Sequence, residues 1–86
     1  MFALNRLGYL GPICDDIWND THARIVCRQL GFNSGVSRRD SFFGDVPNKF
    51  AMDNTQCAGD EDTIQQCYYE TSDDCDFNEG AGVVCL

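Results

Sequence analysis

Apolar residues recur with a helical period in one stretch of the chain, residues 20–30. Four of them fall at i, i+3, i+4 and i+7 and so share one face of a helix: Ala23, Val26, Cys27 and Leu30. Asp20 or Thr21 can cap the start, and Gly31 follows the end, where a left-handed residue is favourable. The pattern predicts an amphipathic helix over about residues 21–30, with a cysteine on its buried face.

Elsewhere the apolar runs are short and are interrupted by glycine, proline and asparagine. Strands are predicted at residues 2–4, 10–14, 36–43, 50–52 and 82–85. The acidic run at residues 60–62 favours a second, short helix over about residues 61–67, since acids stabilise a first turn, and Ile64 and Cys67 would share its inner face. Residues 68–80 are predicted to be loop. These elements indicate one small, loop-rich α+β domain over residues 1–86.

Cysteine is the feature that makes so short a chain stable. A domain of 86 residues buries only about 60% of its unfolded surface, so burial alone gives marginal stability. The six cysteines stand at positions 14, 27, 57, 67, 75 and 85. There is no C-x-x-C pair and His22 is the only histidine, which argues against a zinc site or a redox motif. Three disulfides are expected, but spacing alone cannot choose among about 15 possible pairings.

Charge is unevenly distributed along the chain. The formal net charge is −8, with 14 Asp and Glu against 6 Lys and Arg, which argues against a nucleic-acid partner. All six basic residues lie in residues 1–49, whereas residues 50–86 hold nine acids and no base. This acidic half is either a solvated surface or a site for Ca²⁺ or Mg²⁺, which prefer oxygen ligands. No apolar run is long enough to predict a membrane span.

Four segments carry a more specific pattern. They are residues 11–18 (GPICDDIW), 23–32 (ARIVCRQLGF), 57–67 (CAGDEDTIQQC) and 79–85 (EGAGVVC). In this order they resemble the motifs of the scavenger receptor cysteine-rich domain family, and six cysteines resemble its group A form. The resemblance implies a disulfide-linked α+β fold with a curved antiparallel sheet. The family's leading strand, before Phe2, is missing, so the chain resembles a truncated domain.

The resemblance also implies a disulfide pairing: Cys14–Cys75, Cys27–Cys85 and Cys57–Cys67. On a chain-entropy estimate, each of the two long links stabilises by roughly 4 kcal/mol and the short one by roughly 3 kcal/mol. The first link would hold Asp15 and Asp16 against residues 73–79, with carboxylates within about 5 Å. Like charges at that distance repel by about 3 kcal/mol per pair at an effective dielectric constant of 20, and a divalent cation would turn this repulsion into attraction.

Carried over from the family, two Ca²⁺ sites are expected. The first comprises Asp15, Asp16 and Glu79, and the second comprises Asp53, Asn54 and Asp74, where Mg²⁺ is also considered. The alternative is that residues 53–54 form a turn and residues 73–74 a solvated loop. Binding should be modest, roughly 10⁻⁴ to 10⁻³ M, as in other extracellular modules.

Two further pairs are candidate ligand contacts. Arg38 and Arg39 are either surface charges or part of a polyanion site of the kind that family members build from arginines. Neighbours on a strand point to opposite faces, so both can line one patch only if the strand bulges. Tyr68 and Tyr69 are either binding anchors or a cover for the small core. Trp18 is expected in the core, with an exposed ligand anchor as the alternative.

The leading functional hypothesis is a non-catalytic extracellular module that binds a protein or a polyanionic, for example microbial, surface with the help of Ca²⁺. No catalytic serine motif is present, and the cysteines are expected to be bridged. Asn19-Asp20-Thr21 is a glycosylation acceptor sequence in a secreted protein. The alternative function is an accessory domain that positions the catalytic domain of a secreted mosaic enzyme, such as a serine protease or a lysyl-oxidase-like oxidase. A structural spacer is a third option.

Overall fold

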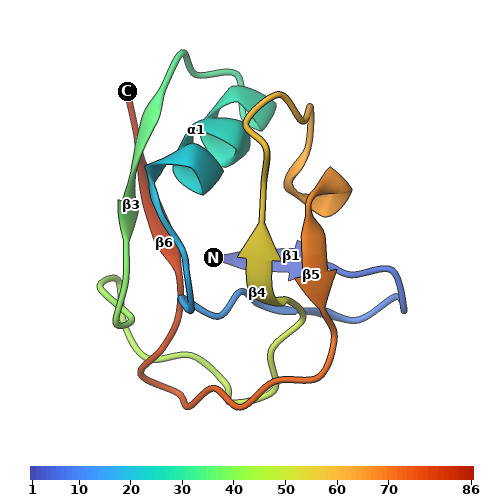
Figure 1. Ribbon diagram of the computed structural model, residues 1–86. Coiled ribbons are helices and arrows are strands. Elements are labelled where there is room, and N and C mark those ends of the chain that lie inside the picture. The colour runs from blue at the N-terminus through green and yellow to red at the C-terminus, as the bar shows by residue number, and fades with distance from the viewer.

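The strands of this protein pair in three antiparallel ladders, and the one helix lies beside the β3–β6 ladder (Figure 1). The computed structural model describes residues 1–86. Its elements are β1 (Phe2–Leu4), β2 (Leu10–Pro12), α1 (Asp20–Gln29), β3 (Gly35–Arg38), β4 (Asp53–Gln56), the 3₁₀ turn η1 (Ile64–Gln66), β5 (Tyr68–Glu70) and β6 (Gly82–Cys85). β1 pairs with β2, β3 with β6, and β4 with β5. The expected antiparallel sheet is thus divided into ladders, which isolated bridges at Ile13–Met52 and Cys14–Gly80 link.

The amphipathic helix is confirmed, with corrections at both ends. Its N-cap is Asn19, not Asp20 or Thr21, because the Asn19 side chain accepts a hydrogen bond from the Thr21 N–H at 2.9 Å. The helix ends at Gln29, and Gly31 has a φ of +94°, as a left-handed C-terminal residue requires. Leu30, predicted on the buried face, is the C-cap residue and is 64% exposed. No helix is long and apolar enough to cross a membrane.

Three of the predicted elements differ in the structure. The strand predicted at residues 36–43 ends at Arg38, because Asp40 and Ser41 adopt left-handed backbone with φ of 57° and 50°. The strand predicted at 50–52 is displaced: Met52 makes only a bridge, and the ladder starts at Asp53. The predicted loop at 68–80 begins with strand β5, which pairs with β4.

The second helix is shorter than expected. It is a single 3₁₀ turn, in which the Gln66 side-chain oxygen accepts a hydrogen bond from the Thr63 backbone N–H at 3.2 Å. The predicted inner face is confirmed, since Ile64 and Cys67 are both buried.

The core lies where α1 faces the strands. Its fully buried members include Ile13, Ala23, Ile25, Ala51 and Met52. Trp18 is only 2% exposed, and its indole N–H donates to the Gly82 carbonyl oxygen at 3.0 Å, so its predicted core position is confirmed. Burial of each large apolar side chain contributes about 1.5–3 kcal/mol to the free energy of unfolding. A chain of this size buries few such side chains, so cross-links are needed for a stable fold.

Three disulfides supply these cross-links, in the pairing that the family resemblance implied. Cys27–Cys85 ties α1 to β6 across a sequence separation of 58. Cys57–Cys67 closes the short loop that contains η1. Cys14–Cys75 joins the end of the β2 segment to the late loop across a sequence separation of 61, with a Cα–Cα distance of 6.2 Å. The last bridge fixes the surroundings of the acidic residues described next.

Candidate cation-binding site

Four carboxylates from separate segments converge beside the Cys14–Cys75 disulfide. We call Asp16, Asp53, Asp74 and Glu79 the acidic cluster. Single carboxylate oxygens of Asp16, Asp53 and Asp74 lie within 4.8 Å of one another, and oxygens of Asp16 and Glu79 lie within the same distance. Asp16 belongs to both groupings. The two sulfur atoms nearby are joined in the disulfide, so the potential cation ligands are oxygens.

Backbone hydrogen bonds explain why these residues meet. The Cys14 N–H donates to the Met52 carbonyl oxygen at 2.9 Å, which places Asp53 beside the segment that carries Asp16. On the other side, Cys14 bridges to Gly80, the residue that follows Glu79. Three stretches of chain therefore run side by side, and each delivers one acid to the same corner. The disulfide to Cys75 brings Asp74 to that corner as a fourth.

The closeness of these acids, together with burial, raises the pKa of two of the carboxyl groups. Burial, followed by the charges of Asp16 and Asp74, raises the pKa of Asp53 to about 6. Burial also raises the pKa of Asp16, and the charges of Glu79 and Asp74 add to this effect. Arg39 acts in the opposite direction and lowers the pKa of Asp16. The protein thus holds these acids close together against their mutual repulsion.

Asp15 lies beside the acidic cluster but its carboxylate has another partner. It is 2% exposed, and its Oδ2 accepts a hydrogen bond from the Asp40 N–H at 2.7 Å. Burial raises its pKa, while the Asp40 N–H and the Arg39 charge lower it. Asp15 therefore holds the turn after β3, and its backbone N–H donates to the Glu79 carbonyl oxygen at 2.8 Å.

Asn54, the remaining predicted ligand, faces the β4–β5 ladder. Its backbone is left-handed, with a φ of 49°, and its side-chain N–H donates to Glu70 Oε1 at 2.8 Å. The backbone N–H of Asn54 donates to Asp53 Oδ1 at 2.7 Å and so orients the Asp53 carboxylate. Asn54 thus shapes the site through Asp53.

The predicted arginine pair is divided between two environments. Arg38 ends β3, is half-buried, and places its guanidinium 5.3 Å from the centre of the Phe42 ring. Arg39 lies just past the strand, is exposed, and acts on the pKa of Asp15 and Asp16. The two side chains therefore have different neighbours, the Phe42 ring for Arg38 and the Asp15–Asp16 pair for Arg39.

The tyrosine pair is also divided, because it lies in a strand. Tyr69 is 4% exposed and its hydroxyl accepts a hydrogen bond from the Arg6 N–H at 2.9 Å, so it covers the core. Tyr68 is 60% exposed and is the one of the two that is free to contact a ligand. Asn19 is exposed at the start of α1, with its side-chain oxygen used as the cap.

Ser41 supports the site although the sequence did not indicate it. The Ser41 hydroxyl donates to the Phe77 carbonyl oxygen at 3.0 Å and accepts from the Gly80 N–H at 2.9 Å. Ser41 therefore fastens the turn after β3 to the loop that carries Glu79. No sequence pattern indicates this, since left-handed backbone at Ser41 is unusual for a residue other than glycine.

The relatives found by sequence and by structure are members of one family. The family model for the scavenger receptor cysteine-rich (SRCR) domain matches residues 4–86. An SRCR domain superfamily protein of Patiria pectinifera is 43% identical over 83 residues, which are 93% of this chain and 7% of the relative's length.

Two solved structures share the fold. The SRCR domain of mouse MARCO, crystallised in a dimeric form, superposes with a TM-score of 0.86 at 30% identity, over 100% of this chain and 83% of that one. The third SRCR domain of murine neurotrypsin superposes with a TM-score of 0.83 at 37% identity, over 94% of this chain and 78% of that one. The chain belongs to the scavenger receptor cysteine-rich domain family.

Proposed function

We propose that this domain is an extracellular ligand-binding module whose acidic cluster binds Ca²⁺. The observation that carries the proposal is the convergence of Asp16, Asp53 and Asp74, with carboxylate oxygens within 4.8 Å of one another. Ca²⁺ binds oxygens at about 2.3–2.6 Å, so two oxygens on one ion are at most about 5 Å apart. The spacing of the three carboxylates therefore suits a single shared cation.

The electrostatics of the site support a cation. The pKa of Asp53, raised to about 6 mainly by burial and further by two neighbouring acids, means that the site is costly to ionise when empty. A divalent ion between the carboxylates would favour the charged forms and reverse this effect. Asp16 and Glu79, with Asp15 beside them, form a weaker second position. Mg²⁺ is the competing ion at the grouping of Asp53 and Asp74.

The ligand is an anionic group on a protein or polysaccharide, bridged by the bound ion. Ca²⁺ takes about 6–8 oxygen ligands, so three or four carboxylates leave positions open for water or for ligand oxygens. Arg39 adds a positive charge close to the acidic cluster. Arg38 and Tyr68, which lie on other parts of the surface, would extend the contact only to a large ligand.

Family membership supports the class of function. SRCR domains are non-catalytic extracellular modules. Since the chain spans 7% of the length of its Patiria relative, the activity of a longer parent protein is a separate question. Secretion, and recognition of a microbial surface in particular, are parts of the proposal.

Calorimetric titration of the oxidised domain with Ca²⁺ tests the cation site. We expect heat that saturates with a Kd of roughly 10⁻⁴ to 10⁻³ M. Asp16→Asn and Asp53→Asn should each weaken binding at least tenfold. Asp62→Asn, an exposed acid outside the acidic cluster, removes the same charge and should leave binding unchanged. Equal weakening by all three variants, or no heat at millimolar calcium, contradicts the proposal.

A second candidate is an accessory domain of a secreted mosaic enzyme, such as a serine protease or a lysyl-oxidase-like oxidase. One observation favours it: the neurotrypsin relative at 37% identity is the third SRCR domain of its parent, so such domains occur as parts of longer chains. The open reading frame around this domain decides between the two. A catalytic domain in the same chain supports the accessory role, and a membrane anchor without a catalytic domain supports the receptor.

A further inference from the structure

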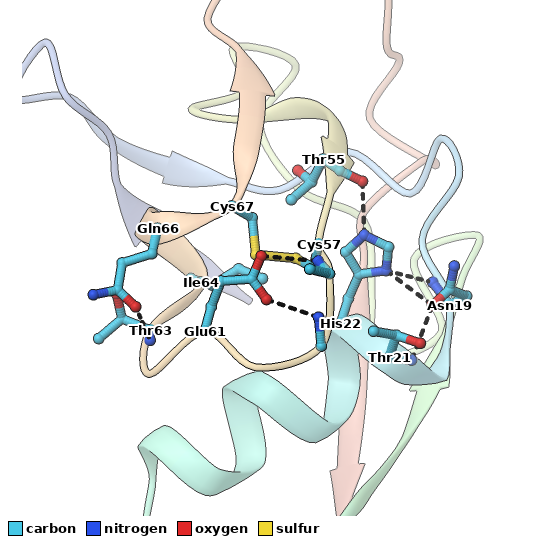
Figure 2. The surroundings of a disulfide bond; sticks show 12 residues. Asn19, Thr21, His22, Thr55, Cys57, Glu61, Thr63, Ile64, Gln66 and Cys67 are labelled. Atoms are coloured by element: carbon cyan, nitrogen blue, oxygen red, sulfur yellow. Dashed lines mark hydrogen bonds between the residues drawn. A yellow bond between two sulfur atoms is a disulfide. The ribbon is translucent and has the colours of Figure 1, made fainter.

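The only histidine of the chain is buried at the start of α1, with both ring nitrogens engaged (Figure 2). His22 is 3% exposed. Its Nδ1 accepts a hydrogen bond from the Asn19 backbone N–H at 3.2 Å, and its Nε2 lies 2.6 Å from the Thr55 carbonyl oxygen. An amide N–H can only donate and a carbonyl oxygen can only accept. The ring is therefore the neutral imidazole with its proton on Nε2.

These contacts join parts of the fold that are distant in sequence. Through Asn19 the ring closes the capping box of α1, and through Thr55 it holds the helix start against β4. One face of the ring stacks on Trp18, with ring centroids 4.9 Å apart. The Trp18 indole N–H in turn donates to Gly82 at the start of β6. His22 therefore lies where the helix, β4 and β6 are held together.

Protonation of the ring would change its contact with the N-cap and would bury a charge. A proton on Nδ1 turns the acceptor of the Asn19 N–H into a donor, so that N–H loses its partner. The new donor could turn only to Asn19 Oδ1, at 3.1 Å, which already caps the Thr21 N–H. The charged ring would also be buried. Burial accordingly lowers the pKa of His22, while the Thr55 carbonyl, the Asn19 contact and the negative charge of Glu61 oppose this in part.

Among the charged groups of the elements packed around the ring, Glu61 is the one whose charge acts on His22. Glu61, from the Cys57–Cys67 loop, accepts from the N–H groups of Ala58 and Gly59, both at 2.8 Å (Figure 2). On α1, Asp20 accepts from Ser37 and Arg24 donates to Thr21. The acids of β4 and of the segment before α1, Asp53, Asp16 and Asp15, lie in or beside the acidic cluster. No carboxylate is hydrogen-bonded to the ring.

We propose that His22 is a proton-operated latch: the neutral ring fastens the start of α1 to β4, and protonation in a mildly acidic medium releases the Asn19 end. Asp16 stays held by the Cys14–Cys75 disulfide and by the hydrogen bond from the Asp15 N–H to the Glu79 carbonyl oxygen, so the latch acts on the start of α1 and not on the acidic cluster.

Nuclear magnetic resonance of the calcium-free domain tests the latch directly. Because His22 is the only histidine, its ring ¹⁵N resonances need no assignment. We expect the Nε2–H tautomer at neutral pH and a titration midpoint below about 6.5, the ordinary value for imidazole. Amide hydrogen exchange of Asn19, corrected for its intrinsic pH dependence, should accelerate at least tenfold with the same midpoint. An Nδ1–H tautomer, or a ring that titrates without any change at Asn19, overturns the proposal.

The matched variant is His22→Gln. Glutamine at this position can accept from the N-cap N–H without titrating, so the protection of Asn19 should become independent of pH between about 7 and 5. A pH-dependent loss of protection that persists in this variant belongs to the carboxylates and overturns the latch. If the variant does not fold, the proposal is still tested by the tautomer and the titration midpoint of the His22 ring in the parent protein. Failure of Ca²⁺ binding with an intact latch contradicts only the proposed function.

Discussion

The backbone N–H of Asp15 donates a 2.8 Å hydrogen bond to the carbonyl oxygen of Glu79, although 63 residues lie between them in the sequence. This bond and the adjacent Cys14–Cys75 disulfide hold the second acid of the Asp15-Asp16 pair beside Glu79, Asp53 and Asp74. The acidic cluster is therefore a property of the fold and depends on its cross-links.

Removing the disulfide beside the acidic cluster should affect both stability and cation binding. We expect the double variant Cys14→Ala/Cys75→Ala to lose about 2–5 kcal/mol of unfolding free energy, because the cross-link closes a long loop. Its Ca²⁺ affinity should fall more than tenfold. The matched control, Cys57→Ala/Cys67→Ala, should lose stability but keep its Ca²⁺ affinity while folded. Denaturant unfolding and calorimetry measure the two effects, and unchanged affinity in the first variant would contradict the role of this disulfide.

The raised pKa of Asp53 predicts a pH dependence with a definite sign. The folded-state pKa of about 6 exceeds the ordinary value of 3.8, so the calcium-free folded state binds the proton more tightly than the unfolded chain. The contribution of Asp53 to stability is therefore greatest below about pH 4 and is lost as the pH rises to about 6. His22 acts in the opposite direction, because its folded pKa is lowered.

The difference in unfolding free energy between the parent and Asp53→Asn, measured from pH 4 to 7, isolates this contribution. We expect the unfolding free energy of the variant to increase relative to that of the parent as the pH rises through that range. A difference that does not change with pH would contradict the burial of Asp53 beside other acids.

Trp18 should be among the most costly core residues to remove. Trp18→Ala is expected to lose about 3–5 kcal/mol of unfolding free energy. Trp18→Phe keeps an aromatic ring against His22 but loses the hydrogen bond to Gly82, and should cost less. Circular dichroism measures both, since the chain has no other tryptophan to report by fluorescence. Equal losses in the two variants would show that the hydrogen bond, and not the packing, dominates.

Asn19 is the expected glycosylation site and also the helix cap. A domain expressed through a secretory pathway should gain glycan mass at Asn19, because the side chain is exposed. Asn19→Asp should abolish the added mass and keep the cap, whereas Asn19→Ala should also lose about 1 kcal/mol of stability. Mass spectrometry and thermal unfolding separate the two roles. Absence of glycan from the parent protein would exclude the modification in that host.

The sequence pattern predicted the structural features that depend on contacts between residues close together in the chain. The spacing of Ala23, Val26 and Cys27 gave the helix correctly, since one buried face is enough to define it. The cap was predicted at Asp20 or Thr21, whereas Asn19 is the N-cap and the Asp20 side chain accepts hydrogen bonds from Ser37, a tertiary contact with no sequence pattern. The strand predicted to reach Phe43 stops early for a similar reason: Asp15 captures the Asp40 N–H and turns the chain.

The sequence predicted which acids belong to the candidate cation site better than it predicted how they are grouped. The family motifs indicated Asp16, Glu79, Asp53 and Asp74, which the fold brings to one corner. Two separate sites were expected, whereas Asp16 lies within reach of both groupings. No motif could show that Asp15 and Asn54 have other hydrogen-bond partners, because those partners depend on backbone geometry at Asp40 and Glu70.

A crystal structure of the oxidised domain grown in millimolar CaCl₂ is the most direct test of the cation site. We predict a bound ion at the corner beside Cys14–Cys75, with carboxylate oxygens of Asp16, Asp53 and Asp74 at about 2.3–2.6 Å. Ordered water alone at that corner, with the three carboxylates turned apart, would contradict the proposal.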